Sequence, residues 1–285
     1  MSTTVTLNVF SGRPNPTFQL DDKQSDELAE RLKGLQSFTE QRPSGAFGGL
    51  GYRGFSVSRS HTHPEGALDL RVHEGIVEQG LHAANLTDEA ELEHWLAQLA
   101  QPHLTPEVAE HLSQVLQPAN RLRFPFPPLK LACPANHAHD APAYNPGLWN
   151  VPSVQPHNNC YNYANNQITN TFAQPGRATG HQATVMACPN VQAGATSDGL
   201  HATPNFSAPL AAGQGWYVAL VIWPNTDYHW YRQDNVGCWS HKPGQTAARN
   251  VDNAGHAISD PRTCNRGPYT VFCTYLVTKK GVHIR

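Results

Sequence analysis

The feature that most constrains this 285-residue chain is an apolar run of eight residues from Trp216 to Trp223. It reads Trp-Tyr-Val-Ala-Leu-Val-Ile-Trp and is nearly unbroken. Such a run is typical of a strand that is covered on both faces, because a strand with one face in water alternates apolar and polar residues. The chain therefore needs a layered domain around this strand, and its 39% of apolar residues suffice for a sizeable core.

Other elements of a β-rich domain surround this run. They are strands expected at 228–234, 238–242 and 269–278 and a polar helix expected at 160–171. The first two strands are separated by a short loop that ends in Gly237, which is a hairpin pattern. We expect residues 157–285 to form a domain in which a helix packs on an antiparallel sheet.

The first 117 residues predict a small α/β unit. The expected elements are a strand at 4–10, a helix from about 21 to 35, strands at 55–57 and within 67–78, and helices at 88–99 and 105–116. Residues 118–156 then contain nine prolines without periodicity, which indicates an extended connector. The whole chain is therefore predicted to be α+β, with an N-terminal unit, a connector and a C-terminal domain.

The charges exclude several classes of partner. The 20 Lys and Arg residues nearly balance the 22 Asp and Glu residues and are scattered along the chain, so no basic face for nucleic acid or anionic lipid is expected. No apolar run is long enough to span a bilayer, which argues against membrane insertion. The start, MSTTVTLNVF, lacks a signal-peptide pattern, so the cytoplasm is the expected location, with signal-independent export as the alternative.

The six cysteines are widely spaced and include no CxxC pair, which favours mostly free thiols over a disulfide scaffold.

One cysteine, Cys160, stands where its thiol would be activated. Cys160 follows two helix-capping asparagines at the first turn of the expected helix, where unpaired N–H groups and the helix dipole favour the thiolate. His229 lies early in the strand after the apolar run, a rigid position for a general base. The two residues together predict a nucleophile and its base.

His241 is the predicted third member, which would orient the imidazole of His229. If the hairpin loop is residues 235–237, with Gly237 in the left-handed conformation, then Tyr231 pairs with His241, and His229 shares that face. A two-residue loop would place His241 on the opposite face. The alternatives in that case are Asp252, Asn253 and Asp227.

Residues near Cys160 and His229 are candidates for the oxyanion and substrate contacts of such a site. The candidates are Gln155, Asn159, Tyr161 and Trp230. The side chain of Gln155 would donate to an oxyanion, although the backbone N–H of Cys160 could do so alone. The aromatic residues would line a cleft, or else fill the core of the β-rich domain.

This order of elements resembles the papain-like superfamily, including the NlpC-type amidases. The resemblance rests on Asn-Asn-Cys-Tyr-Asn-Tyr-Ala at 158–164, on Asp-Tyr-His-Trp-Tyr-Arg-Gln-Asp at 227–234, and on His241 in Trp-Ser-His-Lys-Pro. It covers about 90 residues and implies a cysteine-dependent peptidase, amidase or acyl transferase that acts on a peptide or amide substrate and needs no cofactor. The phrases LNVFSGRPNP and GLGYRGF also resemble a widespread protein family, which implies no mechanism.

Two alternatives to this enzyme remain at the level of the sequence. Cys133, His137, His139 and Asp140 lie within eight residues and offer ligands that zinc or copper accepts, although their spacing matches no standard zinc finger. The other alternative is a non-catalytic binding or toxin-like module whose N-terminal unit docks on a partner. The oligomeric state is left open.

Overall fold

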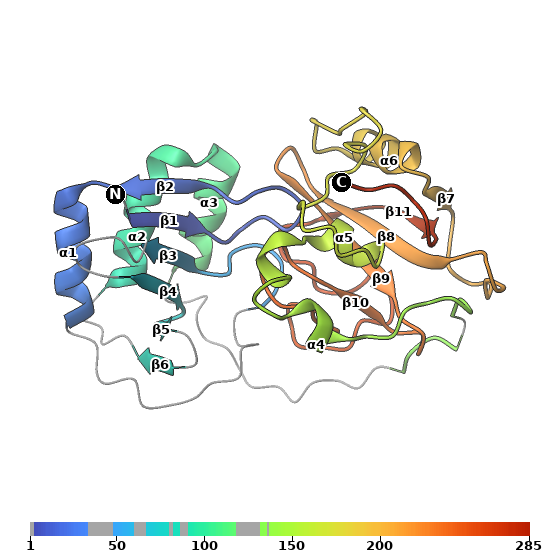
Figure 1. Cartoon of the computed structure of the whole chain (residues 1–285), viewed down its shortest axis with the longest axis horizontal. Coiled ribbons are helices and arrows are strands. Elements are labelled where there is room, and N and C mark those ends of the chain that lie inside the picture. The colour runs from blue at the N-terminus through green and yellow to red at the C-terminus, as the bar shows by residue number, and fades with distance from the viewer. Residues whose placement is uncertain are drawn as a thin grey trace. The chain divides into compact units, whose positions relative to one another are not determined.

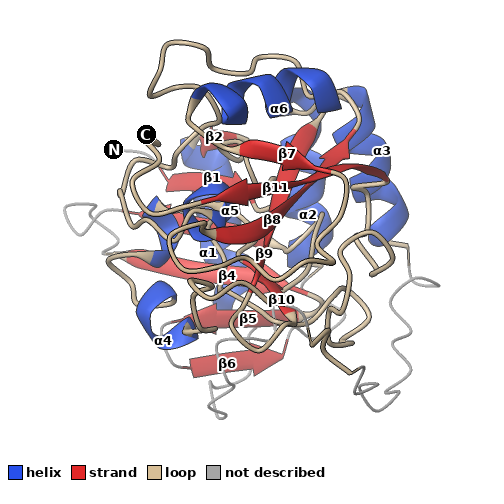
Figure 2. Ribbon diagram, turned by 90° about the vertical axis from the view of Figure 1, so that its right-hand side faces the viewer, coloured by secondary structure: helices blue, strands red, loops and turns tan. Residues whose placement is uncertain are grey.

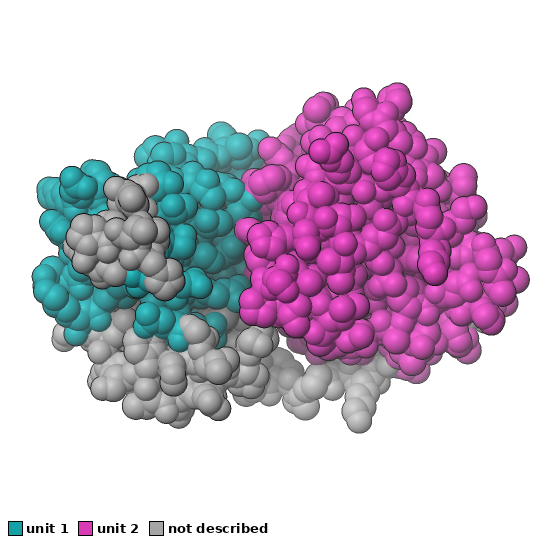
Figure 3. Space-filling view, in the orientation of Figure 1, with its two compact units in different colours: residues 1–9, 15–47, 52–124 teal, residues 10–14, 48–51, 125–285 magenta. Residues whose placement is uncertain are grey.

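The computed structural model describes residues 3–33, 48–59, 67–79, 82–85, 91–117, 132–135 and 137–285. The chain folds as two compact units, which Figure 3 shows in different colours. Unit 1 comprises residues 1–9, 15–47 and 52–124, and unit 2 comprises residues 10–14, 48–51 and 125–285. The predicted three-part division of the chain stays a prediction, and residues 118–131 of the connector lie outside the described residues.

Unit 1 contains an antiparallel sheet with the strand order β2-β1-β3-β4-β5-β6 (Figure 1). The strands are β1 (Thr3–Leu7), β2 (Thr17–Leu20), β3 (Phe55–Arg59), β4 (Leu68–His73), β5 (Ile76–Gln79) and β6 (His82–Asn85). The helices are α1 (Asp22–Lys33), α2 (Leu92–Ala100) and α3 (Pro106–Val115), with a 3-10 turn, η1 (Gln101–His103), between the last two.

The core of unit 1 follows from the periodicity of these elements. Val5 and Leu7 of β1 are fully buried, as the period of two in a strand requires. Leu92, Trp95 and Leu96 are spaced at three and four residues, so they share the buried face of α2, which packs on β4. Together with unit 2, this arrangement confirms the predicted α+β class.

Unit 2 contains a second antiparallel sheet, with the strand order β10-β9-β8-β11-β7 (Figure 2). The strands are β7 (His201–Thr203), β8 (Trp216–Trp223), β9 (Asp227–Gln233), β10 (Trp239–His241) and β11 (Val271–Thr278). The helices are α4 (Pro146–Trp149), α5 (Cys160–Ala164) and α6 (Cys188–Ser197), with a 3-10 turn, η3 (Gln155–His157), before α5. No helix in the described part of the chain is long and apolar enough to cross a membrane.

Strand β8 is the centre of unit 2, as its apolar sequence predicts. All eight of its residues are buried, and β9 and β11 pair with its two edges. Helix α6 packs against β8, and α5 packs against β9 (Figure 1). The start of α5 and the middle of the sheet are thereby brought together in one core.

Helix α5 is shorter than the sequence predicts, because it ends at Ala164 instead of continuing to residue 171. Asn165 is already outside the helical region, and Asn166 has a left-handed φ of 51°. Asparagine tolerates this conformation and commonly ends a helix there. The side chain of Asn158 also accepts hydrogen bonds from the backbone of Thr169 and Asn170, which holds the following residues in a loop.

Four of the six cysteines form disulfides, so the prediction of mostly free thiols is wrong. Cys133 is joined to Cys238 across 105 residues, and Cys188 is joined to Cys273 across 85 residues. Both bonds lie in unit 2. Wide spacing along the chain is no obstacle to a disulfide, because folding brings distant segments into contact, and such long loops give a cross-link a large effect on the unfolded chain.

Candidate functional site

Cys160 is the first residue of α5, and Asn159 is the N-cap of that helix. The Oδ1 of Asn159 accepts hydrogen bonds from the N–H groups of Tyr161 and Asn162, at 3.0 and 3.1 Å. The side chain of Asn162 accepts in return from the N–H of Asn159, at 3.2 Å. This capping box uses the N–H groups that were expected to stabilise a thiolate. A helix of five residues with occupied N–H groups therefore does little to activate Cys160.

His229 on β9 and His241 on β10 are hydrogen-bonded to each other. Gly237 has a left-handed φ of 87°, and Tyr231 pairs with His241, which confirms the predicted hairpin register. The Nε2 of His229 lies 2.9 Å from the Nδ1 of His241. The Nε2 of His241 lies 3.1 Å from the carbonyl oxygen of Val251, which only accepts. His241 therefore carries its proton on Nε2, and its Nδ1 accepts from the Nε2–H of His229.

Ser11 connects this histidine pair to Cys160. Its hydroxyl lies 2.5 Å from the Nδ1 of His229, which has no proton in this tautomer, so Ser11 donates to it. The Ser11 side chain also lies close enough to the Cys160 sulfur to affect the pKa of that thiol. The result is a relay of neutral groups that runs from the thiol through Ser11, His229 and His241. Because each ring nitrogen has a partner, the two imidazoles are buried without a need for charge.

The segment that carries Ser11, residues 10–14, is bound within unit 2 by many hydrogen bonds. The Asp227 carboxylate accepts from three successive backbone N–H groups: those of Ser11 at 2.6 Å, Gly12 at 3.1 Å and Arg13 at 2.9 Å. The Gly12 carbonyl accepts from three side chains: those of Asn159, Gln174 and Tyr228. A Cβ on residue 12 would lie 2.3 Å from the Tyr228 ring, so this close approach requires glycine.

The sequence pattern alone did not point to this segment as part of the site. Residues 11–16 predict only a break after the first strand. A signal was present, however, because serine and glycine beside an otherwise apolar strand end are residues that can enter a crowded polar cluster. The sequence could not reveal that Ser11 would bond His229, since the two residues are 218 positions apart.

The three predicted catalytic side chains are closed off from solvent. Cys160, His229 and His241 are each 0% exposed. Burial raises the pKa of Cys160 to about 12, and the negative charge of Asp227 acts in the same direction. The neighbouring Ser11 hydroxyl and the backbone of Trp230 oppose this shift of the pKa but do not cancel it. The thiol therefore stays protonated at neutral pH, and a substrate has no access to it.

The predicted oxyanion and substrate contacts are occupied within the protein. The Nε2 of Gln155 donates to the carbonyl of Gln245 at 3.2 Å, and Asn159 is used by the helix cap and by Gly12. Tyr161 and Trp230 are fully buried, with ring centroids 5.3 Å apart. These two rings fill the core between α5 and β9, and so do not line a cleft.

The alternatives to His241 hold loops in place. Asp227 binds the backbone of the segment 10–14, as described above. Asp252 accepts from backbone N–H groups of three residues: Ala254, His256 and Asn265. The side chain of Asn253 bonds both backbone groups of Leu50. None of these three side chains hydrogen-bonds the ring of His229, whose nitrogens are paired with Ser11 and His241.

The residues predicted as metal ligands form other contacts in the structure. The sulfur of Cys133 is in a disulfide, so it is not a thiolate ligand. The Nδ1 of His137 lies 3.1 Å from the carbonyl oxygen of Ala135, and the Nδ1 of His139 lies 3.1 Å from the Asp140 carboxylate. Among the residues that the structure describes, no three His, Cys, Asp or Glu side chains are placed to hold a metal ion.

Comparison with known proteins identifies a relative. Over 133 residues, this chain is 50% identical to insoluble matrix shell protein 1 from Ruditapes philippinarum, and the match covers 47% of this chain and 87% of that relative. The chain belongs to the same family. No family model matches the chain, and no solved structure matches it.

This relationship overturns the predicted activity. The relative is named as an insoluble matrix protein of shell, so the prediction of an enzyme that cuts or transfers an amide is wrong. The predicted peptide or amide substrate is withdrawn with it. The prediction of a cytoplasmic location is also wrong, because the relative is a shell matrix protein and because disulfides persist mainly in oxidising compartments. The resemblance to the papain-like superfamily stays a prediction about fold.

We expect Cys160 to resist alkylation in the folded protein. With a pKa of about 12, its thiolate fraction near neutral pH is on the order of a thousandfold below that of an exposed cysteine, and burial slows the reaction further. Treatment with iodoacetamide, followed by peptide mapping, should label Cys160 only after a denaturant is added. Cys264 is the internal comparison: it is partly exposed, burial raises the pKa of its thiol to about 11, and it should therefore react faster than Cys160 but more slowly than a fully exposed cysteine. Rapid native labelling of Cys160 that is lost in His229→Ala would contradict the sealed relay.

Proposed function

We propose that this chain is a non-catalytic structural protein that is exported and built into an insoluble extracellular matrix. The observation that carries the proposal is the 50% identity to insoluble matrix shell protein 1 across 87% of that relative. A relationship this close over most of a protein supports a shared kind of role. In this chain, that role would be to occupy and hold a place in an assembly.

The covalent framework of unit 2 supports the proposal. Its disulfides join Cys133 to Cys238 and Cys188 to Cys273, and bonds of this kind form in the oxidising compartments through which exported proteins pass. Cross-links that oppose unfolding suit a chain that serves as a fixed part of an assembly. Both cross-links close long loops, for which the loss of entropy in the unfolded chain is largest.

The sealed relay of Cys160, Ser11, His229 and His241 supports the same proposal from the side of chemistry. Its groups are neutral, its serine and histidines are hydrogen-bonded to one another, and the three predicted catalytic residues in it are 0% exposed. Such a network adds rigidity and specifies a single core arrangement when all of its members are satisfied. We therefore assign the cluster to the architecture of unit 2, where it fastens the segment 10–14.

Fractionation of the tissue that makes this protein tests the proposal. An antibody against the chain should detect it in extracellular material that detergent does not dissolve and that denaturant with a reductant releases. The cysteine hydrolase prediction would instead place it in the soluble cell extract. Recovery mainly from that soluble fraction would contradict the proposal.

A variant separates structural incorporation from thiol chemistry. Cys160→Ala, expressed with an epitope tag in the same tissue, is expected to enter the insoluble fraction as the unaltered chain does, because the thiol reacts with nothing. A matched Cys264→Ala variant controls for the loss of the other unpaired cysteine. Failure of Cys160→Ala alone to incorporate, with its thermal unfolding unchanged, would show that the thiol is needed for assembly.

A further inference from the structure

A pocket of about 580 Å³ opens in unit 2, away from the sealed relay. It lies between the turn that follows α5, the start of β8 and the turn that follows β11. The lining residues used below are Asp140, Asn166, Gln167, Trp216, Lys279 and Lys280. A volume of this size suits a small organic ligand of one or two rings.

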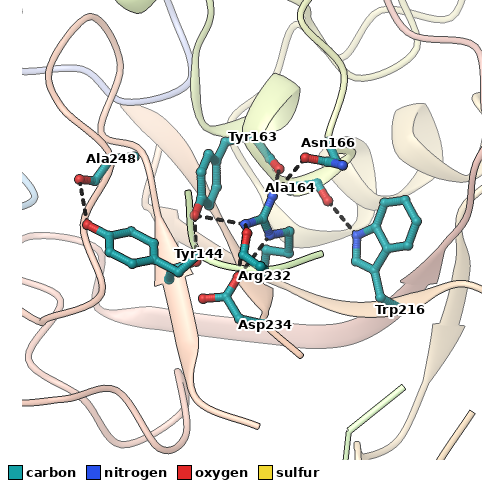
Figure 4. Close-up of polar contacts among 10 residues, drawn as sticks. Tyr144, Tyr163, Ala164, Asn166, Trp216, Arg232, Asp234 and Ala248 are labelled. Carbon is teal, nitrogen blue, oxygen red and sulfur yellow. Dashed lines mark hydrogen bonds and ion pairs between the residues drawn. The ribbon is translucent and has the colours of Figure 1, made fainter. Parts of the chain in front are cut away.

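The amide of Asn166 has one possible orientation. Its Oδ1 accepts a hydrogen bond of 3.1 Å from Arg232, and an arginine side chain only donates (Figure 4). Arg232 is itself fully buried, paired with Asp234 at 2.9 Å and stacked over the Tyr163 ring at 4.1 Å. The Nδ2 of Asn166 is left as a donor without a partner among the described residues, on an exposed side chain.

In the next residue, Gln167, the amide oxygen is the atom available to a ligand. The Nε2 of Gln167 donates to the carbonyl of Val282 at 2.8 Å, so its Oε1 remains as an acceptor. The neighbouring Asn165 has both ends in use, toward Tyr161 and Thr278. The turn after α5 thus offers one fixed donor and one fixed acceptor to a ligand.

The charges of the pocket favour a ligand with a negative group. Lys279 and Lys280 are exposed, and neither side chain has an ion pair or hydrogen bond within the described residues. Asp140 is the only carboxylate of the lining, and a hydrogen bond from His139 and the backbone N–H of Gly213 hold its pKa below the usual value. Two ammonium groups against one carboxylate leave a net charge of about +1 on the lining.

One wall of the pocket is rigid and apolar at its edge. The Nε1 of Trp216 donates to the carbonyl of Ala164 at 2.8 Å, which fixes the indole against the end of α5 (Figure 4). Two backbone N–H groups, of Gly213 and Gly215, likewise hold Asp140 in place. A pocket whose walls are ordered before binding loses little entropy when a ligand enters.

We propose that this pocket binds an acidic sugar, with the carboxylate of the sugar on the Lys279 and Lys280 ammonium groups. Asn166 Nδ2 donates to a ring or hydroxyl oxygen, Gln167 Oε1 accepts from a hydroxyl, and the Trp216 edge contacts the C–H face of the ring. A hydroxyl-bearing ligand is favoured over a simple anion because the site presents a fixed acceptor beside its donors. This proposal deepens the proposed matrix function, since it names the class of polymer that the chain would hold.

Calorimetric titration of the full chain with digalacturonate tests the proposal, and the neutral disaccharide of galactose is the matched ligand without carboxylates. The acidic sugar should bind at low salt at least about tenfold more tightly than the neutral one, and about 150 mM salt should weaken it. In the double variant Lys279→Gln/Lys280→Gln, the Kd for digalacturonate should rise roughly tenfold or more. Lys23→Gln, an exposed lysine on α1, should leave this Kd unchanged.

Three results would overturn the assignment: equal binding of the neutral sugar, equal or tighter binding of the dipeptide Asp-Asp, and an unchanged Kd in the double lysine variant. Binding in solution and location in tissue are separate measurements. If the chain is found in the insoluble fraction but does not bind the acidic sugar, only the proposed sugar site is contradicted. If the chain binds the acidic sugar but is found in the soluble cell extract, only the proposed matrix function is contradicted.

Discussion

Asp227→Ala is expected to lower the free energy of unfolding of unit 2 by about 4 kcal/mol. The carboxylate is fully buried and accepts from the N–H groups of Ser11, Gly12 and Arg13 and from the hydroxyl of Tyr269 at 2.5 Å. Each buried donor that loses its acceptor costs on the order of 1–3 kcal/mol, and a cavity the size of the side chain adds to this. No nearby group in the relay can replace four hydrogen bonds at once.

Urea unfolding followed by tryptophan fluorescence measures this effect, because five of the six tryptophans lie in unit 2. Asp26→Ala, which removes an exposed carboxylate on α1, is the control and should change stability by less than about 0.5 kcal/mol. Hydrogen exchange gives a local readout, since the amides of residues 11–13 should lose their protection in Asp227→Ala. A loss of stability below about 1 kcal/mol, with these amides still protected, would refute the anchoring role.

Removal of the Cys188–Cys273 disulfide should cost unit 2 about 3–4 kcal/mol. The bond links the first residue of α6 to β11 across 85 residues. Without it, the unfolded chain gains the conformational freedom of a long open loop, while the folded contacts of α6 with β8 remain. The double variant Cys188→Ser/Cys273→Ser should therefore fold and bury the same core, but unfold at lower urea concentration and lower temperature.

A reductant provides the comparison for this second effect. Dithiothreitol should lower the unfolding midpoint of the unaltered chain toward that of the double variant, and beyond it once Cys133–Cys238 is also reduced. Cys264→Ser removes an unpaired thiol and should behave as the unaltered chain does, with and without reductant. Identical midpoints for the oxidised chain and the double variant would mean that the cross-link contributes nothing.

The corrected function illustrates how a site-like arrangement can serve architecture. Cys160 lies at a helix start, His229 and His241 are bonded to each other on a hairpin, and Ser11 lies beside both the thiol and His229. The same geometry excludes solvent, because Ser11 occupies the position beside His229 and all four side chains are fully buried. Residue types and order predict proximity, whereas catalysis also requires an opening and an ionisable nucleophile.

Local patterns in the sequence were sufficient for several parts of the fold. The apolar run of β8 required cover on both faces, and Gly237 set the hairpin register that places His229 beside His241. The capping position of Asn159 marked the start of α5. These features were predictable because each depends on neighbours within a few residues, where backbone geometry and periodicity act directly.

Only the tertiary structure decided which distant residues meet. The six cysteines allow many pairings, and the observed bonds span 105 and 85 residues. The segment 10–14 reaches Asp227 and His229 across more than 200 residues and closes the cluster that the sequence presented as a reactive site. Burial of Cys160 and the pKa of its thiol follow from that closure, because both depend on how the whole chain packs around the sulfur and not on the residues that flank it.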